Sequence, residues 1–316
     1  MPGPSVTVRE GRGFTPLWPY TQSLMDVHFI DGTYELFRHF YAVPSSVDAN
    51  GREIGAVRGV LRSVLSMIEG GAIHLGVATD HVVESFRNEL YAGYKTSEGV
   101  PPALLAQFPL LEQMLEAMGV AVWPMTYFEA DDALASAAAR AALDPLVRQV
   151  IICTPDKDLA QCVVGKRIVQ LDRRRGLVRD DAGVVAKFGV RPHSIADYLA
   201  VVGDSADGYP GVRGWGEKAA AAVLSRYPRL EDIPKDWREW DPSITGARRL
   251  CAALAESWDN ALLFRTLATL RLDAPVFDTI EDLRWTGPAA CFETCCQAMG
   301  SPDLFRRAMA LTTAVR

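Results

Sequence analysis

The run MDVHFI, residues 25–30, is short, apolar and followed at once by an acid, Asp31. A run of this length and composition predicts a buried β-strand. Four more such runs follow along the chain, at residues 73–79, 120–123, 149–153 and 167–171. Between them lie segments whose apolar residues have helical spacing, at 54–70, 103–119 and 130–143. Strands that alternate with helices are typical of a mostly parallel sheet, so residues 1–190 are predicted to form one α/β domain flanked by helices.

The chain is long enough for two structural units. It has 316 residues, of which 49% are hydrophobic and 23% charged, as in ordinary globular proteins. From about Arg191 the strand signals stop, and Gly and Pro joints separate helical patterns, which predicts a smaller all-α unit over 191–316. No apolar run approaches the roughly 18 residues of a membrane span, and the first residues lack the apolar stretch of a signal peptide. We therefore expect a cytoplasmic protein without a membrane segment.

Acidic residues gather where the predicted strands end. They follow four different runs, as Asp31, Asp80, the set Glu129, Asp131 and Asp132, and the pair Asp156 and Asp158. In open α/β sheets the reactive crevice lies beyond the carboxyl ends of the strands, so these carboxylates are expected at one edge. Clustered carboxylates repel one another unless cations are present. Since Mg²⁺ and Mn²⁺ prefer such oxygen ligands, the pattern predicts a divalent-metal cluster, with room for two ions.

The stretch FEADDALA, residues 128–135, has a simpler interpretation when taken alone. Acids at the start of a helix are common, because they interact favourably with the positive end of the helix dipole. In the company of the other strand-end acids, the same helix entrance is expected to carry Glu129 and Asp131 as ligands of the first ion, with Asp132 in a supporting role. Two ions can clamp the attacking and leaving oxygens at phosphorus, which favours phosphoester hydrolysis. The sequence has no GxSxG, HExxH or strand-linked GxGxxG motif for other chemistries.

The charge distribution leaves a nucleic-acid partner open. The net charge is −6, which argues against one. Residues 156–191, however, carry nine basic and five acidic side chains, although a solvated surface hairpin explains its RRR run equally well. A second candidate is GDSADGYPGVRGWGEKAAAAVLSRY, residues 203–227, where Gly-rich turns precede a helix and offer N–H groups to phosphates. An αα-hairpin that needs glycines for its turn is the alternative. Asp204 and Asp207 beside this turn complete the predicted metal cluster.

An ordered set of motifs runs from about Asp26 to Tyr227: FIDGTYELFRHFYAVP, VATD, FRNELYAGYK, EADD, TPDKDLAQ and GDSADGYPGVRGWGEKAA. This set resembles the bacterial and phage 5′-nuclease family, which comprises flap endonucleases and the 5′→3′ exonuclease domain of bacterial DNA polymerase I. The resemblance implies a PIN-like nuclease domain over 1–190 with an arch segment at about 84–112. It also implies a helical DNA-binding domain over 191–316, with a helix-three-turn-helix module and C-terminal helices.

The resemblance also assigns roles to single residues. The first metal group resembles Asp31, Asp80, Glu129, Asp131 and Asp132, and the second resembles Asp156, Asp158, Asp204 and Asp207. Lys95, Arg87 and Arg38 match catalytic basic positions that contact the scissile phosphate, and Tyr94 matches an aromatic that stacks on an unpaired base. The positions that match contacts to duplex DNA are Gly211, Arg213, Gly214, Gly216 and Lys218. A potassium ion in relatives corresponds to Ser205 and the backbone of Val212 and Trp215.

The implied activity is that of a freestanding, monomeric, structure-specific 5′ nuclease of DNA replication and repair. Its expected substrates are DNA with a 5′ flap or a 5′ end at a duplex junction, and RNA-primed DNA. The chain departs from the family at Glu98, where an Arg usually follows Lys95 by three residues, and at Gly208, where relatives carry Asn. A DNA-binding relative that does not cut, and a phosphatase of small molecules, are the alternatives that remain.

Overall fold

The strand β1 lies inside a six-stranded sheet in the computed structural model of the protein, which describes residues 24–315. The strand order is β3-β2-β1-β4-β5-β6, in which β1 to β5 run parallel and β6 pairs antiparallel with β5. The strands are β1 Met25–Asp31, β2 Leu75–Asp80, β3 Ala121–Met125, β4 Val147–Cys153, β5 Ile168–Asp172 and β6 Leu177–Arg179. All five predicted strands are present. The sequence did not indicate β6, because three residues are too few to show a period.

The register of the strands brings their acidic ends together. Asp31 pairs with Ala78, two residues before Asp80 at the end of β2. On its other side, β1 pairs with β4 up to Cys153, three residues before Asp156. The carboxyl ends of β1, β2 and β4 therefore lie level with one another, and the predicted mostly parallel α/β sheet is confirmed.

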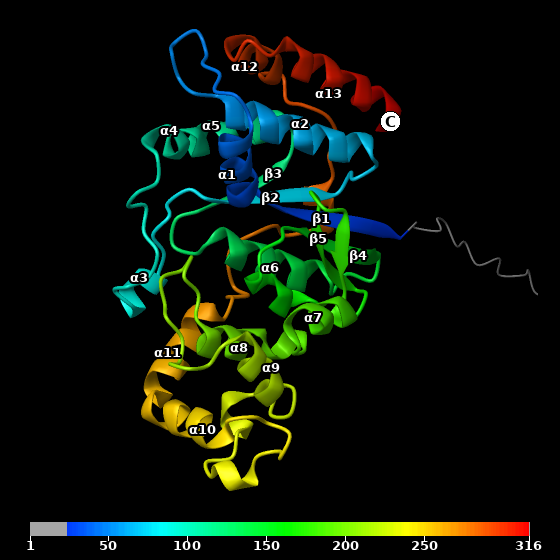
Figure 1. Cartoon of the computed structure of the whole chain (residues 1–316). Coiled ribbons are helices and arrows are strands. Elements are labelled where there is room, and N and C mark those ends of the chain that lie inside the picture. The colour runs from blue at the N-terminus through cyan, green and yellow to red at the C-terminus, as the bar shows by residue number, and fades with distance from the viewer. Residues whose placement is uncertain (1–23, 316) are drawn as a thin grey trace, which may run out of the picture.

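Helices cover both faces of the sheet (Figure 1). The helices α1, α2 and α5 share one apolar core with one face, while α6 packs against the other. The α-helices are α1 Gly32–Ala42, α2 Gly55–Glu69, α3 Arg87–Leu90, α4 Pro102–Leu105, α5 Gln107–Ala117, α6 Ala130–Ala141, α7 Asp181–Phe188, α8 Ile195–Val202, α9 Glu217–Leu224, α10 Ala247–Glu256, α11 Trp258–Ala268, α12 Phe292–Ala298 and α13 Pro302–Val315. Short 3₁₀ helices are η1 Asp158–Cys162, η2 Pro192–Ser194, η3 Leu230–Asp232, η4 Trp237–Glu239 and η5 Ile280–Leu283.

The helices α1 and α6 begin at the acidic edge of the sheet, and acidic residues cap both of them. Asp31 ends β1 and is the N-cap of α1, where its carboxylate accepts a hydrogen bond from the Tyr34 N–H at 2.8 Å. Gly32 follows, and a Cβ there would lie 2.7 Å from Val77, so α1 can leave the sheet only through a residue without a side chain. At the start of α6, Asp132 accepts a hydrogen bond from the N–H of Glu129 at 3.0 Å. The acids Glu129 and Asp132 of FEADDALA thus cap the start of α6.

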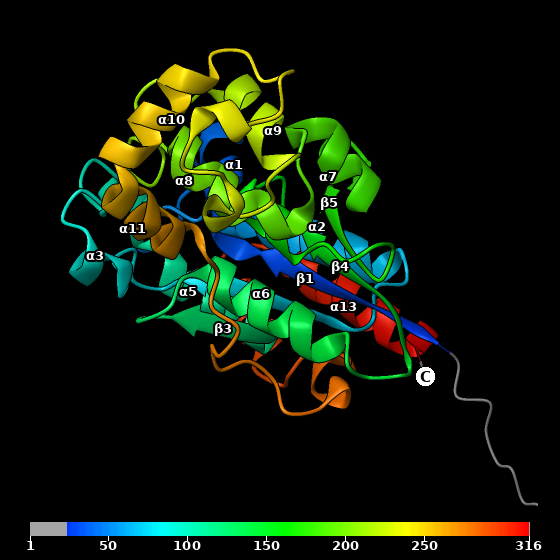
Figure 2. The ribbon, with the colours of Figure 1, turned by 90° about the horizontal axis from the view of Figure 1, so that it is seen from below.

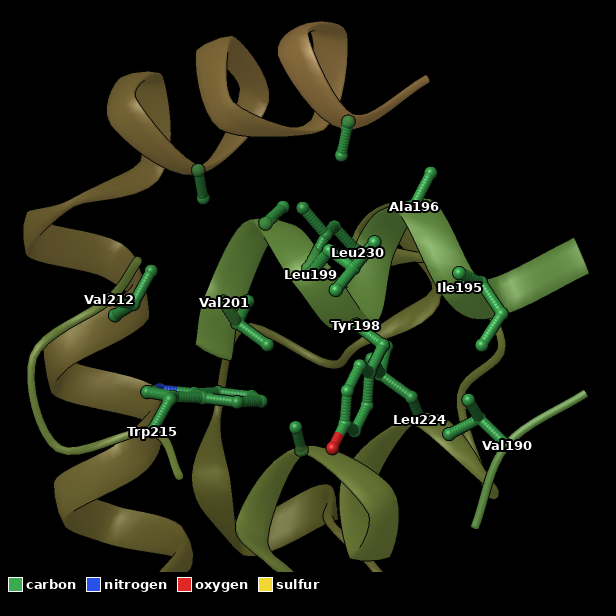
Figure 3. Close-up of a cluster of buried hydrophobic side chains, with 14 of the residues drawn as sticks. Val190, Ile195, Ala196, Tyr198, Leu199, Val201, Val212, Trp215, Leu224 and Leu230 are labelled. Atoms are coloured by element: carbon green, nitrogen blue, oxygen red, sulfur yellow. The ribbon is translucent and has the colours of Figure 1, made fainter. Parts of the chain in front are cut away.

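The helices α8 to α11 form a unit with its own apolar core, which includes Tyr198, Leu199, Trp215 and Leu230 (Figure 3). The same core takes in Tyr94 of the arch segment. Figure 2 shows this unit beyond the carboxyl end of β1. It therefore stands directly over the edge at which the strand-end acids gather.

The chain returns to the sheet after α11. Residues Leu270, Phe277 and Leu283 join the core on the α6 side, while Trp285 and Phe292 join the core beneath α2 and α5. In Figure 1, α12 and α13 lie beside α2, at the opposite end of the molecule from α10. The division of the chain at residue 190 stays a prediction, and the helices of the predicted unit 191–316 pack in two places. None of the helices described is both long enough and apolar enough to cross a membrane.

Candidate metal and nucleic-acid site

Three buried acids meet beneath the helical unit. Asp158 begins η1 after β4, while Asp204 and Asp207 lie in the turn that follows α8. One carboxylate oxygen from each lies within 4.8 Å of the others. Oδ1 of Asp158 is buried and has no hydrogen-bond partner among residues 24–315. Burial, reinforced by the neighbouring charge of Asp156, raises the pKa of Asp158 well above its usual value.

Two lysines partly neutralise this group. The Nζ atom of Lys157 lies 2.5 Å from Asp204, and that of Lys95 lies 3.1 Å from Asp207. Burial still raises the pKa of Asp207, although the charge of Lys95 opposes the change. The two ammonium groups therefore hold the acids together without removing their mutual repulsion. Lys157 was not predicted as a site residue, but its place between Asp156 and Asp158 in TPDKD was a signal for it.

The acids Asp31, Asp80 and Asp131 form a second set, in which Asp31 is buried and the other two are half-buried. Burial raises the pKa of Asp31 to about 7, against hydrogen bonds from the N–H of Tyr34 and the hydroxyl of Thr154, the latter at 2.8 Å. Asp80 accepts a hydrogen bond from the N–H of the first residue of α6 at 2.7 Å, and burial raises its pKa as well.

Asp131 links this set to the first one. Burial raises the pKa of Asp131 well above its usual value, and the charges of Asp156, Asp31 and Asp158 add to that effect. Four of the six predicted ligands that follow strands β1 and β4 or stand at the entrance of α6 thus interact electrostatically in one place, as the parallel topology required. They are Asp31, Asp131, Asp156 and Asp158.

Glu129 is fully engaged by basic and polar neighbours. Its carboxylate lies 2.8 Å from Nζ of Lys95 and 3.3 Å from the guanidinium of Arg87. It also accepts hydrogen bonds from the hydroxyls of Ser85 at 2.6 Å and Tyr94 at 3.3 Å. Burial would raise the pKa of Glu129, but the charges of Lys95 and Arg87 outweigh it and lower the pKa. The lowered pKa favours the charged form of Glu129, whose contacts with Lys95 and Arg87 anchor the arch segment.

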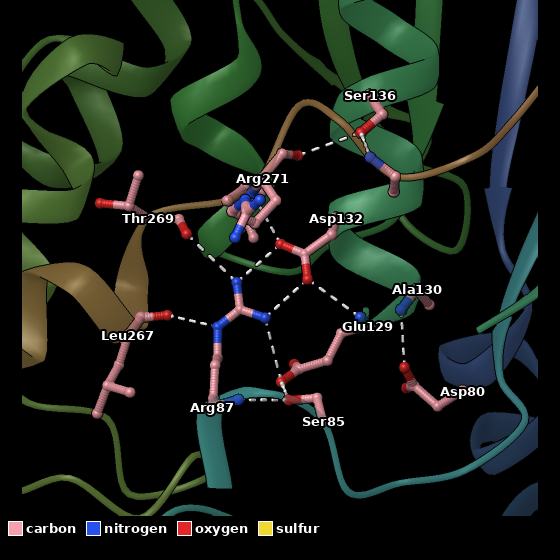
Figure 4. Close-up of polar contacts among 12 residues, drawn as sticks. Asp80, Ser85, Arg87, Glu129, Ala130, Asp132, Ser136, Leu267, Thr269 and Arg271 are labelled. Atoms are coloured by element: carbon pink, nitrogen blue, oxygen red, sulfur yellow. Dashed lines mark hydrogen bonds and ion pairs between the residues drawn. The ribbon is translucent and has the colours of Figure 1, made fainter. Parts of the chain in front are cut away.

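Arg87 and Asp132 form a buried bidentate pair (Figure 4). Both guanidinium–carboxylate hydrogen bonds are 2.7 Å long, and the Arg87 side chain is 1% exposed. The Nε–H of Arg87 donates to the carbonyl of Leu267 at 2.8 Å, and Asp132 accepts from the N–H of Arg271 at 2.8 Å. In this geometry the polar atoms of both groups face protein partners, and the predicted phosphate contact of Arg87 and metal contact of Asp132 stay predictions. Sequence spacing indicated an acid and a base but not that they pair.

Tyr94 and Arg38, which were predicted to contact the substrate, both make contacts within the protein. Tyr94 is 4% exposed and its ring packs in the core of the helical unit, and its stacking on a base stays a prediction. Its hydroxyl, rather than its ring, reaches the site through Glu129. Arg38 on α1 pairs with Glu35 at 2.5 Å and keeps 29% of its side chain exposed, so its phosphate contact stays a prediction.

The Gly-rich turn between α8 and α9 presents an exposed backbone. Gly211 and Gly214 have φ angles of +71° and +84°, a region that favours glycine. Val212 and Trp215 point into the core, whereas Arg213, Gly216 and Lys218 are exposed. The alternative of an αα-hairpin turn and the predicted phosphate-binding turn are thus compatible in one structure. The potassium ligands Ser205, Val212 and Trp215 stay a prediction.

The basic run at 173–175 belongs to the hairpin that joins β5 to β6. Arg173 donates to the hydroxyl of Ser63 at 2.9 Å, and Arg175 pairs with Asp172 at 3.8 Å. The surface-hairpin interpretation of this run is therefore the one that the structure supports.

Comparison with known proteins identifies the family. Residues 26–189 match the model of the 5′-3′ exonuclease N-terminal resolvase-like domain, and residues 190–290 match the 5′-3′ exonuclease C-terminal SAM fold. DNA polymerase I of Pseudomonas aeruginosa is 36% identical over 265 residues, which are 80% of this chain but only 28% of the polymerase. The 5′-3′ exonuclease of Aquifex aeolicus is 32% identical over 225 residues, which are 71% of this chain and 77% of that protein.

Solved structures share the fold. The T5 D15 protein co-crystallised with metal ions has a TM-score of 0.62 at 14% identity, covering 92% of this chain and all of that one. The catalytic core of Rad2 in complex with DNA substrate has a TM-score of 0.59 at 15% identity, covering 92% of this chain and 93% of that one. The two family models, together with the relative from Aquifex aeolicus, show that the chain is a member of the 5′-3′ exonuclease family.

Proposed function

We propose that this chain is a structure-specific 5′ nuclease that hydrolyses DNA phosphodiesters, both as a 5′-flap endonuclease and as a 5′→3′ exonuclease. The observation that carries the proposal is the buried group of Asp158, Asp204 and Asp207, whose oxygens lie within 4.8 Å of one another beside an exposed Gly-rich turn. Family membership supports it, as does the DNA substrate bound to the Rad2 core of the same fold.

The donor set fits Mg²⁺ or Mn²⁺. All of its donors are carboxylate oxygens, which these ions prefer, and the unpartnered Oδ1 of Asp158 is a buried acceptor that needs a cation. We assign Asp158, Asp204 and Asp207 to one ion. Asp156 would join that group. A second ion would be held by Asp31, Asp80, Glu129, Asp131 and Asp132, with Glu129 in direct or water-mediated contact and Asp132 in a supporting role. Bound there, such ions supply a Lewis acid that polarises the scissile phosphate and acidifies water.

The protein's own side chains position the substrate. Lys95 has three ammonium protons, of which two face Glu129 and Asp207, so one is left for a phosphate oxygen. Arg38 adds a half-exposed guanidinium on α1. Arg87 and Asp132 act as positioning residues, because their pair fixes the arch segment to α6 and to the end of α11.

The duplex part of the substrate is assigned to the Gly-rich turn. Gly211, Gly214 and Gly216 offer backbone N–H groups, and Arg213 and Lys218 offer charge, to phosphates rather than bases. We further propose that potassium binds near Ser205 and the backbone of Val212 and Trp215, that RNA-primed DNA is also cut, and that the protein acts as a cytoplasmic monomer.

A cleavage series tests the proposal. The protein is incubated with 5′-flap, nicked, gapped and single-stranded DNA, with Mg²⁺ or Mn²⁺, and products are resolved on a denaturing gel. We expect cleavage near the flap junction, and loss of at least about 100-fold in rate for Asp158→Asn, because a ligand is removed. Glu116→Gln, an exposed acid on α5, is the matched control.

The same assay, with a small phosphate ester added to the substrates, separates the nuclease from a non-cutting DNA-binding relative and from a phosphatase. Tight flap binding without products in either metal supports a DNA-binding relative that does not cut. Faster turnover of a small phosphate ester than of DNA supports a phosphatase. Either result contradicts the proposed nuclease.

A further inference from the structure

Four basic side chains near the Gly-rich turn have no acidic partner. Arg213 and Lys218 belong to the turn and to α9, while Arg248 and Arg249 lie at the start of α10. All four are exposed, and within residues 24–315 their charged groups form no ion pair or side-chain hydrogen bond. Residues 211–218 and 244–252 together contain these four bases and one acid, Glu217. The local charge is therefore strongly positive on a protein whose net charge is −6.

Other arginines of the same unit are paired with acids. The pairs are Arg226 with Asp241 at 3.1 Å, Arg229 with Asp197 at 3.2 Å, Arg238 with Asp236 at 3.3 Å, and Arg265 with Glu231 at 2.6 Å. These guanidinium groups have an internal counter-charge. Arg248 and Arg249 form no ion pair with an acid within residues 24–315, so their charge is available to an external anion.

The helix α10 is held against the Gly-rich turn by one hydrogen bond and by apolar packing around Trp215. The indole N–H of Trp215 donates to the carbonyl of Leu250 at 3.1 Å. The rings of Trp215 and Trp240 meet edge to face with centroids 6.3 Å apart, and Leu250 and Leu254 complete the contact in the same core. Figure 3 shows Trp215 pointing inward from the turn. These contacts therefore hold the start of α10 against the turn.

The side chain of Arg249 lies across the turn itself. A Cβ built on Gly214 would be 2.8 Å from Nη1 of Arg249, and one built on Gly246 would be 3.9 Å from its Nη2. The guanidinium thus lies between the two glycines and extends the exposed backbone of the turn with charge. Beside it, a surface hollow of about 580 Å³ is lined by Trp237, Arg248 and Arg249 among others.

We propose that Arg248 and Arg249 form a second contact site for backbone phosphates, which extends the grip of the Gly-rich turn along the duplex arm of the substrate. The inference rests on the proposed function, because it takes the bound polymer to be duplex DNA. Arginines bind phosphates through a planar fork of donors and read charge rather than sequence. Arg213, Lys218, Arg248 and Arg249 therefore form one phosphate track on two elements that pack together.

Binding without cleavage tests the site. Full-length protein is titrated into a fluorescein-labelled 5′-flap duplex in EDTA, and anisotropy is followed from 50 to 200 mM salt. For the double variant Arg248→Gln/Arg249→Gln we expect the dissociation constant to rise about tenfold, and the slope of log affinity against log salt to fall by about 2, near 0.9 per lost phosphate contact. The double variant Arg248→Lys/Arg249→Lys keeps the charge and is expected to retain the slope.

The matched control is Arg238→Gln, because Arg238 is exposed in the same unit but paired with Asp236. Circular dichroism melting confirms that each variant folds. An unchanged salt slope in the Arg248→Gln/Arg249→Gln variant overturns the second phosphate site, while wild-type cleavage of the flap leaves the proposed function standing. If the wild type neither binds nor cuts the flap, both proposals fail together.

Discussion

The ammonium group of Lys95 lies 2.8 Å from Oε2 of Glu129, and this ion pair ties the arch segment to the entrance of α6. The same ammonium lies 3.1 Å from Asp207 in the turn after α8. Burial disfavours the charged form of Lys95, yet Glu129 and Asp207 raise its pKa well above the ordinary value. Lys95 therefore places a fixed positive charge between the strand-end acids and the acids of the helical unit.

Replacing Lys95 is expected to destabilise the metal-free protein most. In Lys95→Gln, Glu129 and Asp207 lose their shared counter-charge, and the free energy of unfolding should fall by roughly 3 kcal/mol, the scale for one partner lost from a buried pair. Saturating Mn²⁺ supplies positive charge at the same acids and should reduce that loss. Urea unfolding with EDTA and with Mn²⁺ measures both values. Lys166→Gln, on the exposed surface, is the control, and an equal loss in both conditions would contradict this role.

The pair of Arg87 and Asp132 is expected to position the arch segment rather than to contact DNA. Arg87→Leu leaves Asp132 charged and buried, which should cost about 3 to 5 kcal/mol of unfolding free energy. The double variant Arg87→Leu/Asp132→Leu removes both charges and should recover most of that loss. Denaturant unfolding of the two single variants and the double variant gives the coupling energy. If the double variant is stable and still binds flap DNA like the wild type, Arg87 is not a phosphate contact. If the double variant is stable but binds flap DNA more weakly, the phosphate contact of Arg87 is supported instead.

Gly208, which departs from the family pattern, is expected to be required for docking of the arch segment. Its φ is +88°, and a Cβ there would overlap the carbonyl oxygen of Gly93, next to the hydrogen bond from the N–H of Lys95 to the carbonyl of Asp207 at 3.0 Å. Gly208→Ala should therefore displace residues 91–98, beyond the cost of roughly 1 kcal/mol for the backbone conformation alone.

Gly99→Ala isolates that backbone cost. Gly99 has a φ of +82°, but nothing lies within 4 Å of a Cβ built there. Hydrogen exchange of residues 91–98 should rise in Gly208→Ala and stay near the wild-type rate in Gly99→Ala. Equal exchange in the two variants would show that the contact with Gly93 does not hold the arch segment.

Hydrophobic period and strand order made much of the fold predictable. Apolar runs indicated β1 to β5, and the parallel topology then required Asp31 and Asp156 to meet at one edge, as they do. The same reasoning did not find the return of Trp285 and Phe292 to the core beneath α2, because their contact partners are far away in sequence. Helical spacing indicates that a residue is buried, but it does not say against which element.

The site was predictable to the level of residue types but not of partners. Acids at strand ends are read directly from the sequence, whereas the pairing of Arg87 with Asp132 depends on the path of the arch segment in space. Tyr94 illustrates the same limit, since its motif fits an exposed stacking ring as well as a buried hydroxyl donor. Contacts of this kind are set by tertiary packing, which a short motif does not encode.

The amino-terminal edge of the sheet, opposite the acids, is expected to make the fold sensitive to acid. His74 is buried before β2, its Nδ1 has no hydrogen-bond partner among the described residues, and burial lowers its pKa below the usual 6.5. Between the lowered pKa and 6.5 the unfolded chain binds more protons at this position than the folded chain. The contribution of His74 to stability is therefore complete above pH 6.5 and is lost as the pH falls through the folded pKa.

Replacement of His74 by a side chain that does not titrate tests this sign. When the pH is lowered from 7.5 to 5.5, His74→Gln should lose less stability than the wild type, because only the wild type takes up a proton at residue 74 on unfolding. Each unit by which burial lowers the pKa of His74 corresponds to about 1.4 kcal/mol of unfolding free energy. Thermal melting of both proteins at the two pH values in EDTA measures the difference, and the acids of the metal group cancel because both proteins carry them. His193→Gln is the matched control, because His193 is an exposed residue of η2. A gap between wild type and His74→Gln that does not change with pH would mean that the pKa of His74 is the same in the folded and unfolded chains.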